Sequence, residues 1–199
     1  MKKLFQIMLL ISLLSTNVYA LNLKEGVKFA GGALTSYMIH EGGHYFAAEV
    51  TNNDMEWEFM KDGQLISFYS NPESDHDGLY INSAGLVSQA IMSEIIIDSK
   101  LNNDDFFVRG MMFWNVLNPI MYAVDYWWLK RTNEIKDNTY FGDLAGIEYY
   151  SDKKTANIFA GTMVLLALWH GHRFCSEETT NFNLMPIKDG VGLNFTYRF

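Results

Sequence analysis

Two histidines and a glutamate within one short stretch are the residues of this sequence best suited to chemistry. His40 and His44 are four residues apart, so on a helix they lie one turn apart on the same face and can reach a single metal ion. Glu41 lies beside that face, where it can take a proton from a water molecule at the metal. We therefore predict that His40 and His44 bind Zn²⁺ and that Glu41 is the general base.

A tetrahedral zinc site held by two histidines needs a third protein ligand and one open position. Asp125 is the first candidate, because it is the only formal charge in residues 110–129 and an isolated carboxylate in an apolar segment needs a partner of opposite charge. Two acidic residues elsewhere are alternative ligands. They are Glu94, which stands four residues before Asp98, and Asp143, which lies in Phe-Gly-Asp-Leu-Ala-Gly.

The first twenty residues have the features of an export signal. Lys2 and Lys3 precede an apolar stretch, residues 4–14, and Val18-Tyr19-Ala20 is a small-residue cleavage site. We predict that residues 1–20 are a signal peptide and that residues 21–199 form a single domain with a β-hairpin as its C-terminal tail.

The composition of the chain indicates which partners and which location to expect. The formal net charge of −8 argues against nucleic acid as a partner. The single cysteine, Cys175, excludes an internal disulfide and a structural zinc site built from cysteines. An exported chain of this kind is stabilised by packing, by a metal or by the bilayer, and a hydrophobic content of 49% favours the bilayer. We therefore expect membrane lipid as a partner and a location in the membrane of a bacterial-type cell envelope.

Four apolar segments separated by polar loops predict a mainly α fold. They span residues 29–50, 79–97, 110–129 and 155–171. The third is twenty residues long, enough for a helix to cross the hydrocarbon layer. Strand-forming residues around Asp-Gly turns predict hairpins at residues 57–69 and 182–199. The expected fold is a membrane-embedded bundle of about four helices with one or two small β-hairpins.

The order of these motifs resembles the site-2-protease family of intramembrane zinc metallopeptidases. The resemblance extends over residues 38–125. It is carried by His40, Glu41, Gly43 and His44, then by Ala84-Gly-Leu-Val-Ser-Gln89, and then by Asn115 or Asn118 with Pro119 and Asp125. The chain departs from the family pattern where Leu86 replaces a proline, Asn118 is adjacent to Pro119, and Tyr126 replaces a glycine. The resemblance implies that Asp125 completes the zinc site.

The function expected from these residues is zinc-dependent hydrolysis of peptide bonds within or near the membrane, with a polypeptide as substrate. Asn115, Asn118 and Gln89 are candidate donors to the oxyanion or to the substrate backbone. One alternative is a non-catalytic helical envelope membrane protein. The other is a soluble exported metallopeptidase similar to thermolysin, in which Glu94 is the zinc ligand and Asp98 orients a histidine.

Overall fold

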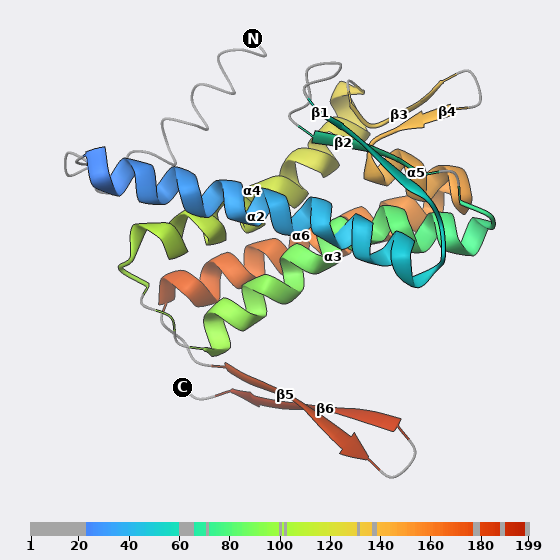
Figure 1. Cartoon of the computed structure of the whole chain (residues 1–199). Helices are drawn as coiled ribbons and strands as arrows, with labels where there is room; N and C mark the ends of the chain where they lie inside the picture. Colours follow the sequence, from blue (N-terminus) through green and yellow to red (C-terminus); the bar gives the residue numbers. More distant parts are fainter. Residues whose placement is uncertain are drawn as a thin grey trace.

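The computed structural model describes residues 23–59, 66–70, 72–99, 101, 103–130, 132–136, 139–176, 180–187 and 190–197. This part of the chain is mainly helical (Figure 1). Its long helices are α2 (Leu23–Val50), α3 (Asp75–Asp98), α4 (Phe106–Val124) and α6 (Lys153–Ser176), and the short helix α5 (Asp143–Tyr150) precedes α6. The predicted signal peptide, residues 1–20, lies outside the described residues.

Two of the helix starts are fixed by capping side chains. Ser74 Oγ accepts a hydrogen bond from the Asp77 N–H at 3.1 Å and so begins α3. Asp105 Oδ1 accepts one from the Phe107 N–H at 2.8 Å and so begins α4. Each cap satisfies a backbone donor that has no partner within the first turn of a helix.

Helix α2 crosses α4 at a point where only glycine fits. A Cβ atom on Gly32 would lie 1.9 Å from the Phe107 carbonyl oxygen, and one on Gly110 would lie 2.0 Å from the Phe29 carbonyl oxygen. The two backbones are therefore in direct contact. Helix α3 packs on another side of α2, and α6 packs against α4 and α3. This arrangement brings the middle of α2 between α3 and α4.

The hydrophobic core is divided into clusters between these helices. The largest joins α3, α4, α5 and α6 with the segment after α4, and its buried members are Leu86, Ala123, Tyr126, Leu144, Ile147, Ala156, Ala160 and Met163. A second cluster, Ile96, Val108, Met111 and Met112, packs α3 against α4. A third, Ala47, Ala48 and Ile81, holds the end of α2 on α3.

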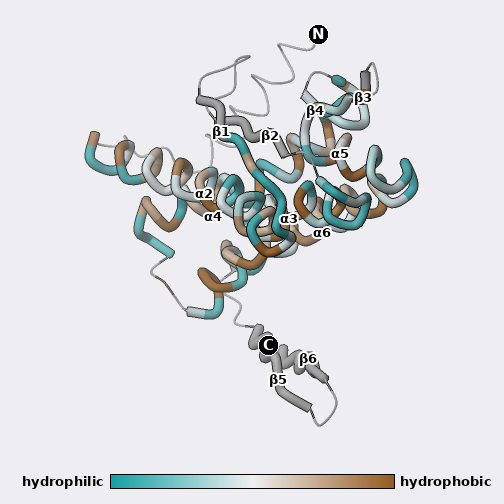
Figure 2. The backbone as a smooth tube through the Cα atoms, turned by 45° about the vertical axis from the view of Figure 1, so that its right-hand side comes forward, coloured by the Kyte–Doolittle hydropathy of each residue, from teal (hydrophilic) through white to brown (hydrophobic). Residues whose placement is uncertain are grey.

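The expectation of a membrane-embedded bundle is wrong. Among the described helices, none combines the length and the apolar content that crossing a membrane requires. The physical reason is that buried polar residues interrupt each apolar segment, as Ser36, His40 and Glu41 do in α2 and Gln89 does in α3. Figure 2 shows hydrophobic and hydrophilic residues alternating along the helices.

The segment 110–129, expected as one helix, is divided in the structure. Helix α4 ends at Val124, and a π-helix, η1, continues from Asp125 to Leu129. Lys130 then takes a left-handed conformation with φ of 50° and ends the helical run. Asp125 is therefore the first residue of the π-helix, and Thr132, which lies beyond Lys130, binds its carboxylate.

Three antiparallel hairpins accompany the helices. The strands β1 (Met55–Phe59) and β2 (Ile66–Ser70) pair where the first hairpin was predicted, and β5 (Thr180–Ile187) and β6 (Gly190–Tyr197) pair where the C-terminal one was predicted. The third hairpin, β3 (Glu134–Lys136) with β4 (Thr139–Phe141), and helix α5 form in residues that were expected to be a loop. Figure 1 shows β3, β4 and α5 at the same end of the molecule.

Candidate metal centre

Two histidines and one aspartate converge at the centre of the helical body. His40 Nε2 lies 3.2 Å from His44 Nε2 and 3.2 Å from Asp143 Oδ2. His44 Nε2 lies 3.4 Å from the same oxygen, and all three side chains are buried. Because Zn–N and Zn–O bonds of about 2.0–2.1 Å place neighbouring ligand atoms of a tetrahedron about 3.3 Å apart, the three atoms have the separations of three corners of a zinc site.

The other nitrogen of each imidazole is bound to an acceptor. His40 Nδ1 lies 3.2 Å from Gln89 Oε1, and His44 Nδ1 lies 2.7 Å from the Ile81 carbonyl oxygen. The Ile81 carbonyl can only accept, which assigns the proton of His44 to Nδ1. His40 Nδ1 also lies 3.4 Å from the donor Asn118 Nδ2, but its shorter contact with Gln89 Oε1 favours the same tautomer, in which each Nε2 presents a lone pair. Both lone pairs and the Asp143 carboxylate therefore face one point, and such an arrangement favours a cation there.

A chain of amides and hydroxyls holds Gln89 in this orientation. Asn118 Nδ2 donates to Gln89 Oε1 at 2.8 Å, and Gln89 Nε2 donates to Ser36 Oγ at 3.0 Å. Ser36 Oγ in turn donates to Asn115 Oδ1. The three residues predicted as oxyanion or substrate donors, Gln89, Asn115 and Asn118, are thus brought close to the histidines. Gln89 and Asn118 bind each other and contact His40 Nδ1, whereas Asn115 is linked to Gln89 through Ser36.

Asp143 reaches the histidines from the first residue of α5. Gly142 precedes it with φ of +79°, and a Cβ atom there would lie 2.1 Å from the Thr132 carbonyl oxygen, so the position requires glycine. Asn133 Oδ1 accepts the Leu144 N–H at 3.1 Å and caps the helix. Asp143 Oδ2 faces the two imidazoles and receives no hydrogen bond from any other described group.

The structure brings Asp143, and not Asp125, to the histidines. Asp125 Oδ2 accepts hydrogen bonds from the Thr132 N–H at 2.8 Å and from Thr132 Oγ1 at 2.9 Å, and it is outside the group of converging ligand atoms. It holds the loop that leads to Asn133. The partner that this isolated carboxylate needs is therefore Thr132, in the loop that positions α5.

Glu94, the other alternative ligand, is also placed elsewhere. Its carboxylate binds His170 Nε2 at 2.9 Å and Arg173 Nη1 at 2.7–2.8 Å. Asp98 Oδ1 lies 3.3 Å from Arg173 Nη2. This ion-pair network joins α3 to α6, and Arg173 is fully buried within it.

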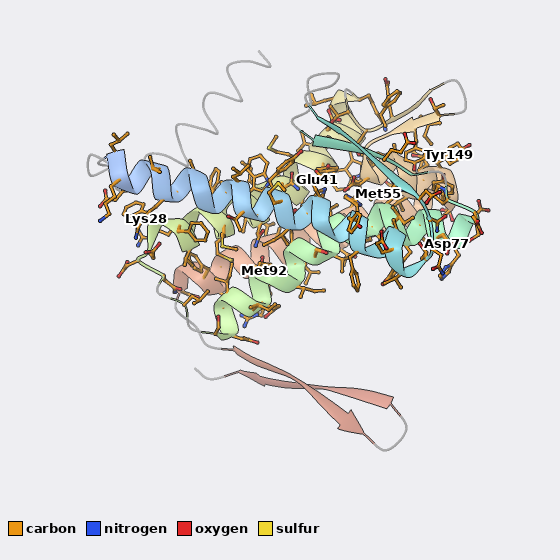
Figure 3. All side chains as sticks on the ribbon, viewed as in Figure 1. Lys28, Glu41, Met55, Asp77, Met92 and Tyr149 are labelled. Carbon is orange, nitrogen blue, oxygen red and sulfur yellow. The ribbon has the colours of Figure 1, made fainter. Side chains whose placement is uncertain are left out.

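Glu41 lies on α2 beside the two histidines and is 6% exposed. Figure 3 labels it on α2 near the middle of the helical body. Burial raises the pKa of Glu41 above its usual value, against the opposing charges of His40 and His44. A carboxylate of raised pKa is a better proton acceptor, as general-base catalysis requires.

The pKa values of the converging residues are shifted by their mutual attraction. Burial lowers the pKa of His44, but the charges of Asp143 and Glu41 and the hydrogen bonds to Asp143 and to the Ile81 carbonyl together raise it above the usual value. Burial raises the pKa of Asp143, but His44 and His40 lower it further, to well below its usual range. The buried carboxylate is therefore stabilised in its charged form, which is the form that binds a metal ion.

Two residues that contact the histidines were not predicted as site residues. Gly85 packs against the imidazoles, and a Cβ atom there would lie 2.3 Å from His44 Nε2 and 2.8 Å from His40 Nε2. Tyr122 Oη lies 3.4 Å from His40 Nε2, and burial, with the charges of Asp143 and Glu41, raises its pKa well above the usual value. The signal for Gly85 was present, because it is the glycine in the Ala84–Gln89 motif. Tyr122 carried no signal among eleven tyrosines.

No protein-family model, no curated protein and no solved structure matches this chain.

Proposed function

We propose that this protein is a zinc-dependent metallopeptidase in which His40, His44 and Asp143 hold the ion. The observation that carries the proposal is the convergence of two imidazole lone pairs and one carboxylate oxygen at tetrahedral separations of 3.2–3.4 Å. Imidazole nitrogen and carboxylate oxygen are common zinc ligands, and three protein ligands leave the fourth position open, as in catalytic zinc sites.

The chemistry follows from the residues around that position. When bound by these residues, a zinc ion would lower the pKa of a water at the open position to about 7 and would polarise the scissile carbonyl. Glu41 accepts a proton from that water as its oxygen attacks the carbonyl carbon. When the C–N bond breaks, Glu41 transfers the proton to the leaving amine. The raised pKa of Glu41 supports both halves of this transfer.

The proposed location is the cell envelope, because residues 1–20 have the sequence of an export signal. The proposed substrate is a polypeptide that is extended at the cleaved bond, since the backbone of a helical segment is shielded from attack.

The test compares Glu41→Gln with wild type in metal content and in hydrolysis of a mixture of internally quenched peptides. Zinc is measured by mass spectrometry of the purified protein. We expect one zinc per chain in both proteins and hydrolysis by wild type alone. His40→Ala should lose both zinc and activity, and Glu49→Gln, an exposed glutamate of the same helix, is the matched control that should retain both.

Two outcomes contradict the proposal. If the wild-type protein binds no zinc, zinc is not the catalytic metal. If Glu41→Gln cleaves the peptides as fast as wild type, Glu41 is not the general base. Zinc binding without any hydrolysis by wild type would instead favour a structural metal site, the alternative in which the bundle is not catalytic.

A further inference from the structure

We propose that Tyr122 is a further catalytic residue, whose hydroxyl donates a hydrogen bond to the oxygen of the scissile carbonyl as negative charge develops on it. The proposal rests on the metallopeptidase function proposed above. The oxyanion donor would then be Tyr122 of α4, and not one of the three amides predicted from the sequence, Gln89, Asn115 and Asn118.

Tyr122 is in contact with the atom of His40 that faces the metal position. It lies on α4 one turn after Asn118, and its hydroxyl oxygen is 3.4 Å from His40 Nε2. The phenol and imidazole rings lie 5.5 Å apart between centroids, tilted by 41°. Because His40 Nδ1 carries the proton that binds Gln89, Nε2 is an acceptor and the Tyr122 hydroxyl is the donor of this contact.

A metal ion at the site would take the lone pair that Tyr122 now contacts. The hydroxyl would then need another acceptor, since a buried donor without a partner is costly. The lone pairs of His44 Nε2 and Asp143 Oδ2 face the same ion, and the Glu41 carboxylate is assigned to the attacking water. A substrate oxygen that entered the open position beside His40 Nε2 would offer the hydroxyl an acceptor, and a donor already in place stabilises developing charge without reorganisation.

Two of the three amides near the site already donate to other groups. Asn118 Nδ2 donates to Gln89 Oε1, and Gln89 Nε2 donates to Ser36 Oγ. Asn115 Nδ2 has no partner among the described groups, but Asn115 Oδ1 accepts from Ser36 Oγ, which is one helical turn of α2 before His40, whereas the Tyr122 hydroxyl contacts His40 Nε2 itself. Tyr122 is therefore the better placed donor for the reacting carbonyl.

The first experiment measures steady-state hydrolysis of the quenched peptides by Tyr122→Phe. Removal of a single oxyanion donor lowers kcat by about 10²–10³-fold. We expect this loss with KM within a few-fold of wild type and with zinc content unchanged. The matched control is Tyr126→Phe, which removes a hydroxyl bound to Glu148 one turn further along and should leave kcat unchanged.

A second experiment does not depend on hydrolysis. Cobalt(II) replaces zinc, and inorganic phosphate is titrated while the visible absorption bands of the cobalt are followed. Tyr122→Phe should bind phosphate about tenfold more weakly than wild type, with the same cobalt spectrum before phosphate is added. Tyr126→Phe should bind phosphate as wild type does.

The outcomes separate this inference from the proposed function. If kcat and phosphate affinity are both unchanged in Tyr122→Phe, the inference is refuted while the metallopeptidase stands. If Tyr122→Phe loses the metal, Tyr122 is a ligand or a structural support and the inference is again refuted. If wild type binds cobalt and phosphate but cleaves no peptide, the proposed function fails, and the phosphate titration alone decides whether Tyr122 contacts an oxyanion. A wild-type protein that binds neither metal refutes both.

Discussion

Replacing Asp143 by alanine should remove most of the stabilisation that zinc gives to the folded protein. A ligand that binds only the folded state stabilises it by about 2.7 kcal/mol when its free concentration is about 100 times Kd. For a chain of this size, each kcal/mol corresponds to about 2–4 °C in Tm. Wild type at that zinc concentration should therefore melt roughly 5–11 °C higher than in EDTA.

The magnitude for the variant follows from the geometry. Within the described part of the chain, Asp143 Oδ2 is one of three converging ligand atoms, at 3.2 and 3.4 Å from the two imidazole nitrogens. Changes in residues that merely support a ligand already weaken metal binding by about 10–100-fold, so loss of a ligand should weaken it at least 100-fold. At the same zinc concentration the variant then gains only about 0.4 kcal/mol, or about 1 °C.

The assay is differential scanning fluorimetry in a zinc buffer and in EDTA, with zinc affinity measured by competition with a chromophoric chelator. Asp125→Asn is the informative control, because it retains an oxygen that can accept from Thr132 and removes only the charge. Its zinc-dependent rise in Tm should match that of wild type. The ligand set would be refuted if zinc raised the Tm of Asp143→Ala as much as that of wild type. It would also be refuted if Asp125→Asn alone lost the zinc-dependent rise in Tm.

Three further predictions concern the groups that support the site and the fold. Gln89→Leu removes the acceptor of the His40 Nδ1–H and should weaken zinc binding by about 10–100-fold, measured by chelator competition. Gly85→Ala places a Cβ atom 2.3 Å from His44 Nε2. It should destabilise the protein by about 1–3 kcal/mol in urea unfolding and abolish zinc binding, and a fully loaded variant would contradict the close approach. The pKa of Glu94 is lowered below its usual value, because its hydrogen bonds to His170 and Arg173 outweigh the effect of burial. The stability that it contributes is therefore present above its unfolded pKa of about 4.3 and is lost as the pH falls through the folded value. The free energy of unfolding of wild type should exceed that of Glu94→Gln by about 1–3 kcal/mol at pH 7. This difference should disappear in acid. A difference that is independent of pH would show that the charge of Glu94 is not its source.

The histidine pair was predictable because its geometry is local. Residues four apart on a helix share a face whatever the rest of the chain does, so His40 and His44 could be paired from spacing alone. Spacing did not single out the third converging residue, so Asp125 was preferred and Glu94 and Asp143 stayed as alternatives. Asp143 meets the histidines only because the loop after η1 folds back through Thr132 and Asn133, and this contact involves residues far from α2 in the sequence.

Asp125 was expected to bind the metal because an isolated carboxylate in an apolar segment needs a partner. A lone carboxylate in an apolar segment does need partners, and Asp125 has them in the Thr132 N–H and hydroxyl. The glycine before Asp143 could have indicated that a helix begins there, because Gly142 takes a positive φ immediately before α5. The membrane-embedded fold was predicted from apolar content, which does not distinguish helices facing lipid from helices packed around buried polar residues such as Gln89 and Ser36.

The three converging atoms come from segments far apart in the sequence, with His44 and Asp143 separated by roughly a hundred residues. An ion bound there would act as a removable cross-link that closes a very long loop, and closing a loop of that size restricts the unfolded chain more than closing a short one. Metal supply would then decide when α2 is linked to α5, and a chain without metal would stay more open to degradation until the cross-link forms.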